Sequence, residues 1–206
     1  MKKILIPAIL FIAFACENSI ENSSVCPDCI KGKPENHLIY AQDLTSAKLL
    51  FSSNNINLDS YRIYEFGTDD IGYRHVRCYQ YVNNLTLLNE KLIFHYDAFG
   101  KFKSLSGTII TDIDCDSVPT MDISDVKKMY LKKVGEDVAP NIDKTKIENG
   151  CVLCEFGYYN VNAYVSFSTP EFILAWKVRP EGSAYPFAYI NDSAKTVIHY
   201  INGNSF

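Results

Sequence analysis

A histidine and an aspartate stand two positions apart in the stretch LIFHYDAFGKFKSLSG, and both are residue types that acid–base catalysis uses. The residues before His95 and after Gly100 alternate in polarity, as in two strands. Asp97 and Gly100 fit the first and fourth positions of a turn between them, because Asp bonds the backbone ahead and Gly accepts a positive φ. We therefore predict a hairpin turn, with His95 held by a neighbour within the sheet rather than acting in catalysis.

Other catalytic motifs are missing from the sequence. A thermolysin-like zinc site needs H-E-x-x-H, but His37, His75, His95 and His199 are followed by Leu, Val, Tyr and Tyr. The sequence has no G-x-S-x-G and no glycine-rich phosphate loop. A Cys/His nucleophilic pair stays open, as does an anion site at the arginines that flank His75. We predict a protein that is not an enzyme and uses no cofactor.

The first residues, MKKILIPAILFIAFAC, have the layout of a secretory signal. Two lysines precede an uncharged segment, Ile4–Ala15, which is too short to span a bilayer. IAFAC resembles a bacterial lipobox, whose cysteine is acylated and becomes the first residue of the mature protein. We expect residues 1–15 to be a signal peptide and Cys16 to carry the lipid; a plain cleaved signal is the alternative. The protein is then exported and lipid-anchored in a bacterial cell envelope, at the outer membrane, with the leaflet open.

Six cysteines follow Cys16, and an even number in an exported protein is typical of disulfides. A zinc site built by CPDC and CVLC is the alternative, with four thiolates at the usual spacing. Free thiols are a third possibility. The disulfide candidates are Cys26, Cys29, Cys78, Cys115, Cys151 and Cys154, and the zinc alternative uses Cys26, Cys29, Cys151 and Cys154.

Composition favours a folded chain rich in strands. Of the 206 residues, 47% are hydrophobic and 21% are charged, so the chain can bury a core. Fourteen Tyr and twelve Phe are typical of sheets. The net charge of −4, without a long basic run, argues against nucleic acid as the partner.

Periodicity predicts two sets of elements, each a helix and several strands. Helical spacing covers residues 43–53 and 121–135, with Asp43 and Asp122 as candidate N-caps and Gly135 as the stop. The expected strands are Tyr61–Phe66, Tyr73–Val82, Leu88–Tyr96, Phe102–Ile113, Cys151–Tyr159, Ala163–Phe167, Phe172–Val178, Phe187–Ile190 and Val197–Ile201. The fold class is therefore α+β, as two small units in which a helix packs on an antiparallel sheet. We expect a lipid-anchored tether with CPDC at 16–35, one unit at 36–116 and a second at 117–206.

Two stretches resemble known propeptide domains. GYRHVRCYQYVNNLTLLNEKLIFHYDAFGKFKSLSG is similar to the fungalysin/thermolysin propeptide, and ILAWKVRPEGSAYPFAYINDSAKTVIHYING resembles the PepSY domain that follows it in such propeptides. The first resemblance rests on Gly72, His75, Val76, Arg77, Gln80, Leu92, His95, Asp97, Gly100, Ser106 and Gly107. The second rests on Leu174, Ala175, Trp176, Lys177 and Val178. Cys78 departs from the family pattern, as do Asn191 and Lys195 in the last hairpin.

The resemblance implies a function that a surface carries out. Family propeptides assist the folding of their protease and block its cleft, whereas this sequence lacks the peptidase motif. We expect a non-catalytic envelope lipoprotein that inhibits or chaperones a separate metalloprotease in trans. A tethered binding module for glycan, peptide or host protein, or a structural envelope subunit, is the alternative.

Overall fold

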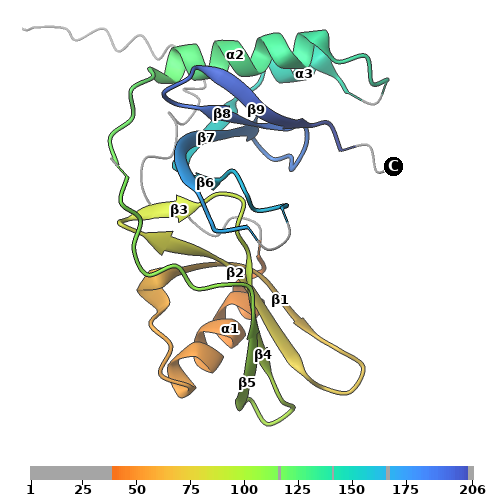
Figure 1. Ribbon diagram of the computed structural model, residues 1–206. Helices are drawn as coiled ribbons and strands as arrows, with labels where there is room; N and C mark the ends of the chain where they lie inside the picture. Colours follow the sequence, from red (N-terminus) through yellow and green to blue (C-terminus); the bar gives the residue numbers. More distant parts are fainter. Residues whose placement is uncertain (1–38, 116, 141, 166–167, 204–206) are drawn as a thin grey trace, which may run out of the picture.

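The structure is a computed structural model that describes residues 39–115, 117–140, 142–165 and 168–203. Cys16, the tether and its CPDC cysteines lie outside the described residues. Helices and antiparallel strands are both present, which confirms the α+β class (Figure 1). No described helix is both long enough and apolar enough to cross a membrane.

The first group of elements is a sheet with one helix on one face. Alternate residues of the strands, such as Val76, Cys78 and Phe94, are buried against Ala47 and Phe51 of the helix. Period-two burial on one face is what the alternating sequence predicts. The elements of this group are α1 (Ala41–Ser53), the short 3₁₀ helix η1 (Leu58–Ser60), β1 (Tyr61–Thr68), β2 (Arg74–Val82), β4 (Leu92–Tyr96) and β5 (Phe102–Ser106).

The second group packs a longer helix on one face of a second sheet. Val126, Tyr130 and Val134 recur at helical spacing and are fully buried against the strands, with Trp176 among their neighbours. Lysines occupy much of the remaining surface of this helix. The elements are β3 (Leu85–Leu87), α2 (Ile123–Glu136), α3 (Lys144–Glu148), β6 (Val152–Asn160), β7 (Phe172–Pro180), β8 (Phe187–Asn191) and β9 (Thr196–Ile201).

The short strand β3 joins the two groups. It turns back on β2 through Asn83 and Asn84, which both have positive φ, and then pairs in parallel with β6. Gly157 makes this approach possible, since a Cβ there would lie 2.3 Å from the backbone oxygen of Thr86. Hydrogen-bonded neighbours therefore run continuously from β5 to β9, in the order β5-β4-β2-β3-β6-β7-β8-β9.

Several predicted boundaries are wrong for identifiable reasons. The strand expected at Phe102–Ile113 ends at Ser106, because the main chain of Ile110 pairs with the Gln80 side chain instead of a strand. The strand expected at Leu88–Tyr96 starts at Leu92. The strand expected at Ala163–Phe167 is a turn over its described residues, closed by the Asn160 side chain, which accepts the amides of Asn162 and Glu171.

The helix ends also differ from prediction. Helix α1 begins two residues before Asp43, with Tyr40 as its N-cap. Asp122 does occupy the N-cap position of α2, although its side chain makes no capping hydrogen bond. Gly135 lies inside α2, which ends at Glu136. Capping residues are local signals for where a helix begins or ends. In these two helices the packing of the buried face has more influence on the observed ends than the capping residues have.

Candidate functional site

The stretch with His95 and Asp97 forms the predicted turn. The Asp97 carboxylate accepts the amide protons of Phe99 at 3.0 Å and Lys101 at 2.9 Å. Gly100 has φ +83 and donates its amide to the Asp97 carbonyl. Asp97 thus closes the β4–β5 hairpin, and the turn prediction is confirmed.

His95 pairs with a second histidine across the sheet. The register of β2 and β4 places it opposite His75, and their Nδ1 atoms are 2.8 Å apart. Their outer nitrogens reach Asp69 Oδ2 at 3.3 Å and Ser106 Oγ at 2.9 Å. The pKa of His95 is lowered. Desolvation is the largest cause, and the nearby positive charges of His75 and Arg77 contribute less. Neighbouring side chains bond the ring nitrogens of His95, as predicted. That one of these neighbours is His75 was not predicted.

The other motif positions of the first sheet are also structural. The Arg77 guanidinium pairs with Glu65, and Arg74 donates to the Ala98 carbonyl. The anion site considered beside His75 stays a hypothesis. The Gln80 amide both donates to and accepts from the main chain of Ile110. The two remaining glycines of the motif both have positive φ: they are Gly72, at +84, and Gly107, at +97.

Trp176 is held by an aspartate that the sequence analysis did not single out. Asp192 is fully buried, and its carboxylate accepts the Trp176 indole at 2.8 Å. It also accepts the amides of Thr120 at 2.7 Å and Met121 at 3.1 Å, just before α2. Burial acts to raise the pKa of Asp192, but these hydrogen bonds outweigh burial and lower it. Asp192 therefore ties α2 to the β8–β9 turn.

The four cysteines that the structure describes differ in state and surroundings. Cys78 is a free thiol buried under α1, and burial raises its pKa to about 12, which disfavours the thiolate that a nucleophile needs. Cys115 is also a free thiol, so neither of these two forms the disulfide that was predicted. Cys154 is buried in the second core, and Cys151 is disulfide-bonded. Among the described residues, no three His, Cys, Asp or Glu side chains are grouped to hold a metal.

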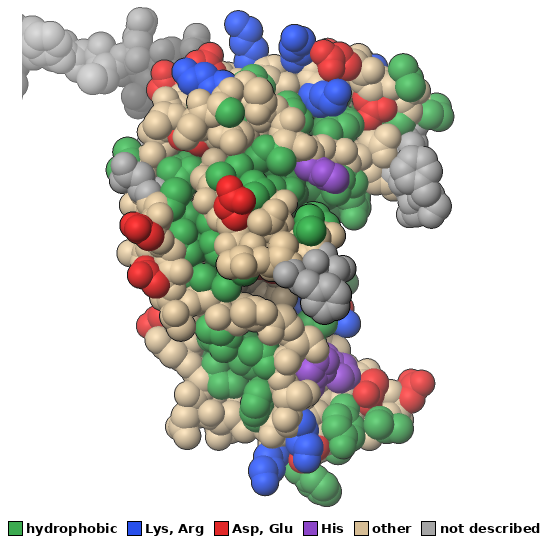
Figure 2. Space-filling model, viewed as in Figure 1, with side chains coloured by type: hydrophobic (Ala, Val, Ile, Leu, Met, Phe, Trp, Pro, Cys, Tyr) green, Lys and Arg blue, Asp and Glu red, His purple; other side chains and the backbone are tan. Residues whose placement is uncertain are grey.

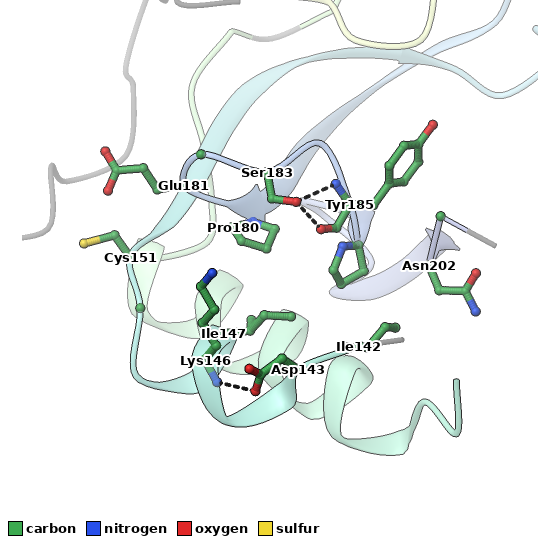
Figure 3. A pocket seen from close by; sticks show the side chains of 14 residues that line it. Ile142, Asp143, Lys146, Ile147, Cys151, Pro180, Glu181, Ser183, Tyr185 and Asn202 are labelled. Carbon is green, nitrogen blue, oxygen red and sulfur yellow. Dashed lines mark hydrogen bonds between the residues drawn. The ribbon is translucent and has the colours of Figure 1, made fainter. Parts of the chain in front are cut away.

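A pocket of about 550 Å³ lies between α3 and the β7–β8 connection (Figure 3). Two of its polar side chains serve local turns: Asp143 accepts the Lys146 amide, and Ser183 bonds the main chain of Tyr185. No histidine lines it.

The strongest candidate for function is the surface where the uncovered faces of the two sheets meet. Helix α1 covers one face of the first sheet and α2 one face of the second, and the opposite faces approach each other (Figure 1). Arg62 of β1 lies 2.8 Å from Glu155 of β6, and Lys177 of β7 lies over the ring of Tyr79 of β2 at 5.2 Å. We call Arg62, Tyr79, Glu155, Lys177 and Arg179 the junction cluster.

The junction cluster contains one strongly perturbed amine. Desolvation lowers the pKa of Lys177 to about 8; Glu155 opposes this, while Arg62 and Arg179 add to it. The rings of Tyr79, Phe187 and Tyr189 surround the ammonium at 5.2, 5.4 and 5.9 Å. Such an arrangement can hold and present a cation. Sequence reasoning quoted Lys177 only as a position in the resemblance, since nothing local indicates that these rings converge on it.

Residues 59–109 match the family model described as Fungalysin/Thermolysin Propeptide Motif, and no curated protein matches the chain. The matched range runs from η1 past β5 and contains every position on which the first resemblance rests. In the structure these residues form hairpins, the His75–His95 pair and the hydrogen bonds between the Gln80 side chain and the main chain of Ile110. This part of the chain is therefore similar to the propeptide of fungalysin and thermolysin, and the protein contains a metalloprotease propeptide-like module.

Proposed function

We propose that the protein is a non-catalytic, lipid-anchored envelope protein that binds a metalloprotease in trans, as an inhibitor or folding chaperone. The observation that carries the proposal is the match at residues 59–109 to a propeptide motif. The described motif side chains serve the fold, so any action on a protease would come from the surface that they support.

The outer edge of β9 is the segment we propose to contact the protease. Among the described strands β9 pairs only with β8, which leaves one row of its backbone groups available. A protease cleft accepts extended backbone through main-chain hydrogen bonds. The segment His199–Phe206 is also where the resembled precursors connect to their enzyme.

The test is to titrate the mature chain, starting at Cys16, into thermolysin-like metalloproteases from the same envelope. We expect inhibition, or an increased yield of refolded protease, together with a complex at micromolar concentration. A chain that ends at Tyr200 is the control and should lose the effect while keeping the cooperative unfolding of the rest. Absence of inhibition, refolding assistance and complex across the panel would exclude the proposed role.

Anchoring at Cys16 is a separate part of the proposal, supported by the lysine–apolar–FAC layout of the first residues. Several acyl chains hold a protein at a membrane firmly, whereas one binds weakly. Cys16→Ser should move the protein from the membrane fraction to the soluble fraction and abolish incorporation of labelled palmitate. A Cys16→Ser protein that stays in the membrane and still incorporates palmitate would contradict the anchor.

A further inference from the structure

The junction cluster has an excess of positive charge in a chain whose net charge is negative. It holds three basic side chains and a single carboxylate, that of Glu155. Two guanidinium nitrogens of Arg62 bind the oxygens of this carboxylate, at N···O distances of 2.8 and 3.2 Å. Arg179 donates to the carbonyls of Pro180 and Ser183, at 3.4 and 3.0 Å. Each guanidinium therefore has acceptors within the protein.

Lys177 has the fewest acceptors of the three basic groups of the cluster, counted over the described residues. Its ammonium carries three N–H donors, and its one hydrogen bond to the part of the chain that the structure describes is to the Tyr79 hydroxyl, at 3.4 Å. No carboxylate of the described residues lies within 4 Å of it. Glu155, opposite Lys177 in the β6–β7 register, is already paired with Arg62. An ammonium that is partly removed from water needs acceptors, and among the described residues only the Tyr79 hydroxyl supplies one.

The side chain of Lys177 is half-buried, so a partner can still reach it. It lies on the face of the second sheet that α2 leaves uncovered, next to the uncovered face of the first sheet. The outline of the molecule is indented between the part with α1 and the part with α2 (Figure 2). The exposed ring of Tyr164 and the half-buried ring of Phe187 belong to the same region, close to Lys177 or to its aromatic neighbours.

We propose that the junction cluster is a docking site for an acidic side chain, Asp or Glu, of an extended polypeptide partner, with Lys177 as the residue that receives the carboxylate. A carboxylate supplies the acceptors that the ammonium lacks and offsets the local charge excess. The rings around Lys177 exclude water from the contact and provide apolar area for the residues beside the acidic one. The inference requires a polypeptide partner and does not require that this partner be a protease.

The experiment selects peptides on the mature protein from a phage-displayed library of random heptapeptides. Parallel selections use Lys177→Met, which keeps the length of the side chain and removes its charge, and Lys177→Arg, which keeps the charge. Lys128→Met, at an exposed lysine of α2, is the matched control. The best binder is then synthesised with its acidic residue as Glu and as Gln, and both affinities are measured by calorimetry.

We expect Asp and Glu to be enriched at one position of the peptides that bind the wild type and Lys128→Met, and not of those that bind Lys177→Met. Changing Glu to Gln in the peptide should weaken binding to the wild type at least tenfold, and have little effect with Lys177→Met. Lys177→Arg should retain most of the preference. Failure to recover binders, or the same peptides from the wild type and Lys177→Met, would overturn the inference. Because no protease is involved, this result is independent of the test of the proposed function.

Discussion

The guanidinium of Arg62 lies 2.8 Å from the carboxylate of Glu155, and this ion pair joins β1 of the first sheet to β6 of the second. Only 11% and 14% of the two side chains are exposed, so the charges are largely removed from water. Breaking such a pair on one side leaves the other charge without a partner, which costs more than the pair itself contributes.

We predict that Glu155→Gln and Arg62→Met each lower the free energy of unfolding by about 2–4 kcal/mol, and that the double variant loses less than the sum of both. Chemical denaturation of the four proteins gives the coupling energy. The exposed pair of Arg77 and Glu65 is the control, and Glu65→Gln should cost under about 1 kcal/mol. Additive effects at Arg62 and Glu155 would show that the pair does not couple the sheets.

The histidine pair predicts a loss of stability in mild acid. A hydrogen bond between the two Nδ1 atoms needs one of them deprotonated, and the pKa of His95 is lowered in the fold. The unfolded chain then binds more protons than the folded one as the pH falls through about 6.5, so stability falls over that range. The positive charge of Arg77 adds to the lowering of the pKa of His95.

Denaturation midpoints at pH 7.5 and pH 5 measure this effect. His95→Gln should show a smaller decrease between the two pH values than the wild type. His199, exposed on β9, provides the control, and His199→Gln should behave as the wild type. An equal decrease in all three proteins would show that the histidine pair does not cause the loss of stability in acid.

Asp192 should be the most sensitive position in the second group of elements. Its two oxygens accept the Trp176 indole and the amides of Thr120 and Met121, and an asparagine has only one acceptor oxygen. We expect Asp192→Asn to lower the free energy of unfolding by roughly 2–4 kcal/mol at pH 7, because a buried N–H would face an amide N–H.

The difference between Asp192→Asn and the wild type should also shrink in acid. The pKa of Asp192 is lowered in the fold, so its contribution is present above the unfolded pKa of about 3.9 and is lost as the pH falls through the folded value. Asp70→Asn, at an exposed position, is the control and should leave stability unchanged. A pH-independent difference would mean that the charge of Asp192 is not what stabilises the fold.

Gly107 is predicted to be intolerant of a side chain. Its φ is +97, and a Cβ would lie 2.6 Å from the backbone oxygen of Lys91. We expect Gly107→Ala to cost about 2–4 kcal/mol, combining the unfavourable φ with the contact. Two alanine controls separate these causes: Gly182 has φ +70 in open space, and Gly67 has neither a positive φ nor a neighbour within 4 Å. Thermal unfolding should rank Gly107→Ala below Gly182→Ala, and Gly182→Ala below Gly67→Ala.

Local chemistry made part of this molecule predictable from its sequence. The β4–β5 turn follows from Asp97 and Gly100, because both act through backbone atoms a few residues away. The buried side of α2 follows from helical spacing, and the strands follow from alternation. The propeptide resemblance could also be recognised from the sequence, since its positions lie close together in one stretch of chain.

The tertiary structure decided what depends on residues far apart in the chain. Strand register placed His75 against His95, and the crossing of β3 to β6 placed Arg62 against Glu155. Neither pairing leaves a trace in local sequence, because period and propensity indicate which face a side chain takes but not what lies opposite. For the same reason the sequence showed Lys177 only as one position in a strand. The approach of the two uncovered sheet faces surrounds its ammonium with aromatic side chains, and no carboxylate of the described residues pairs with it.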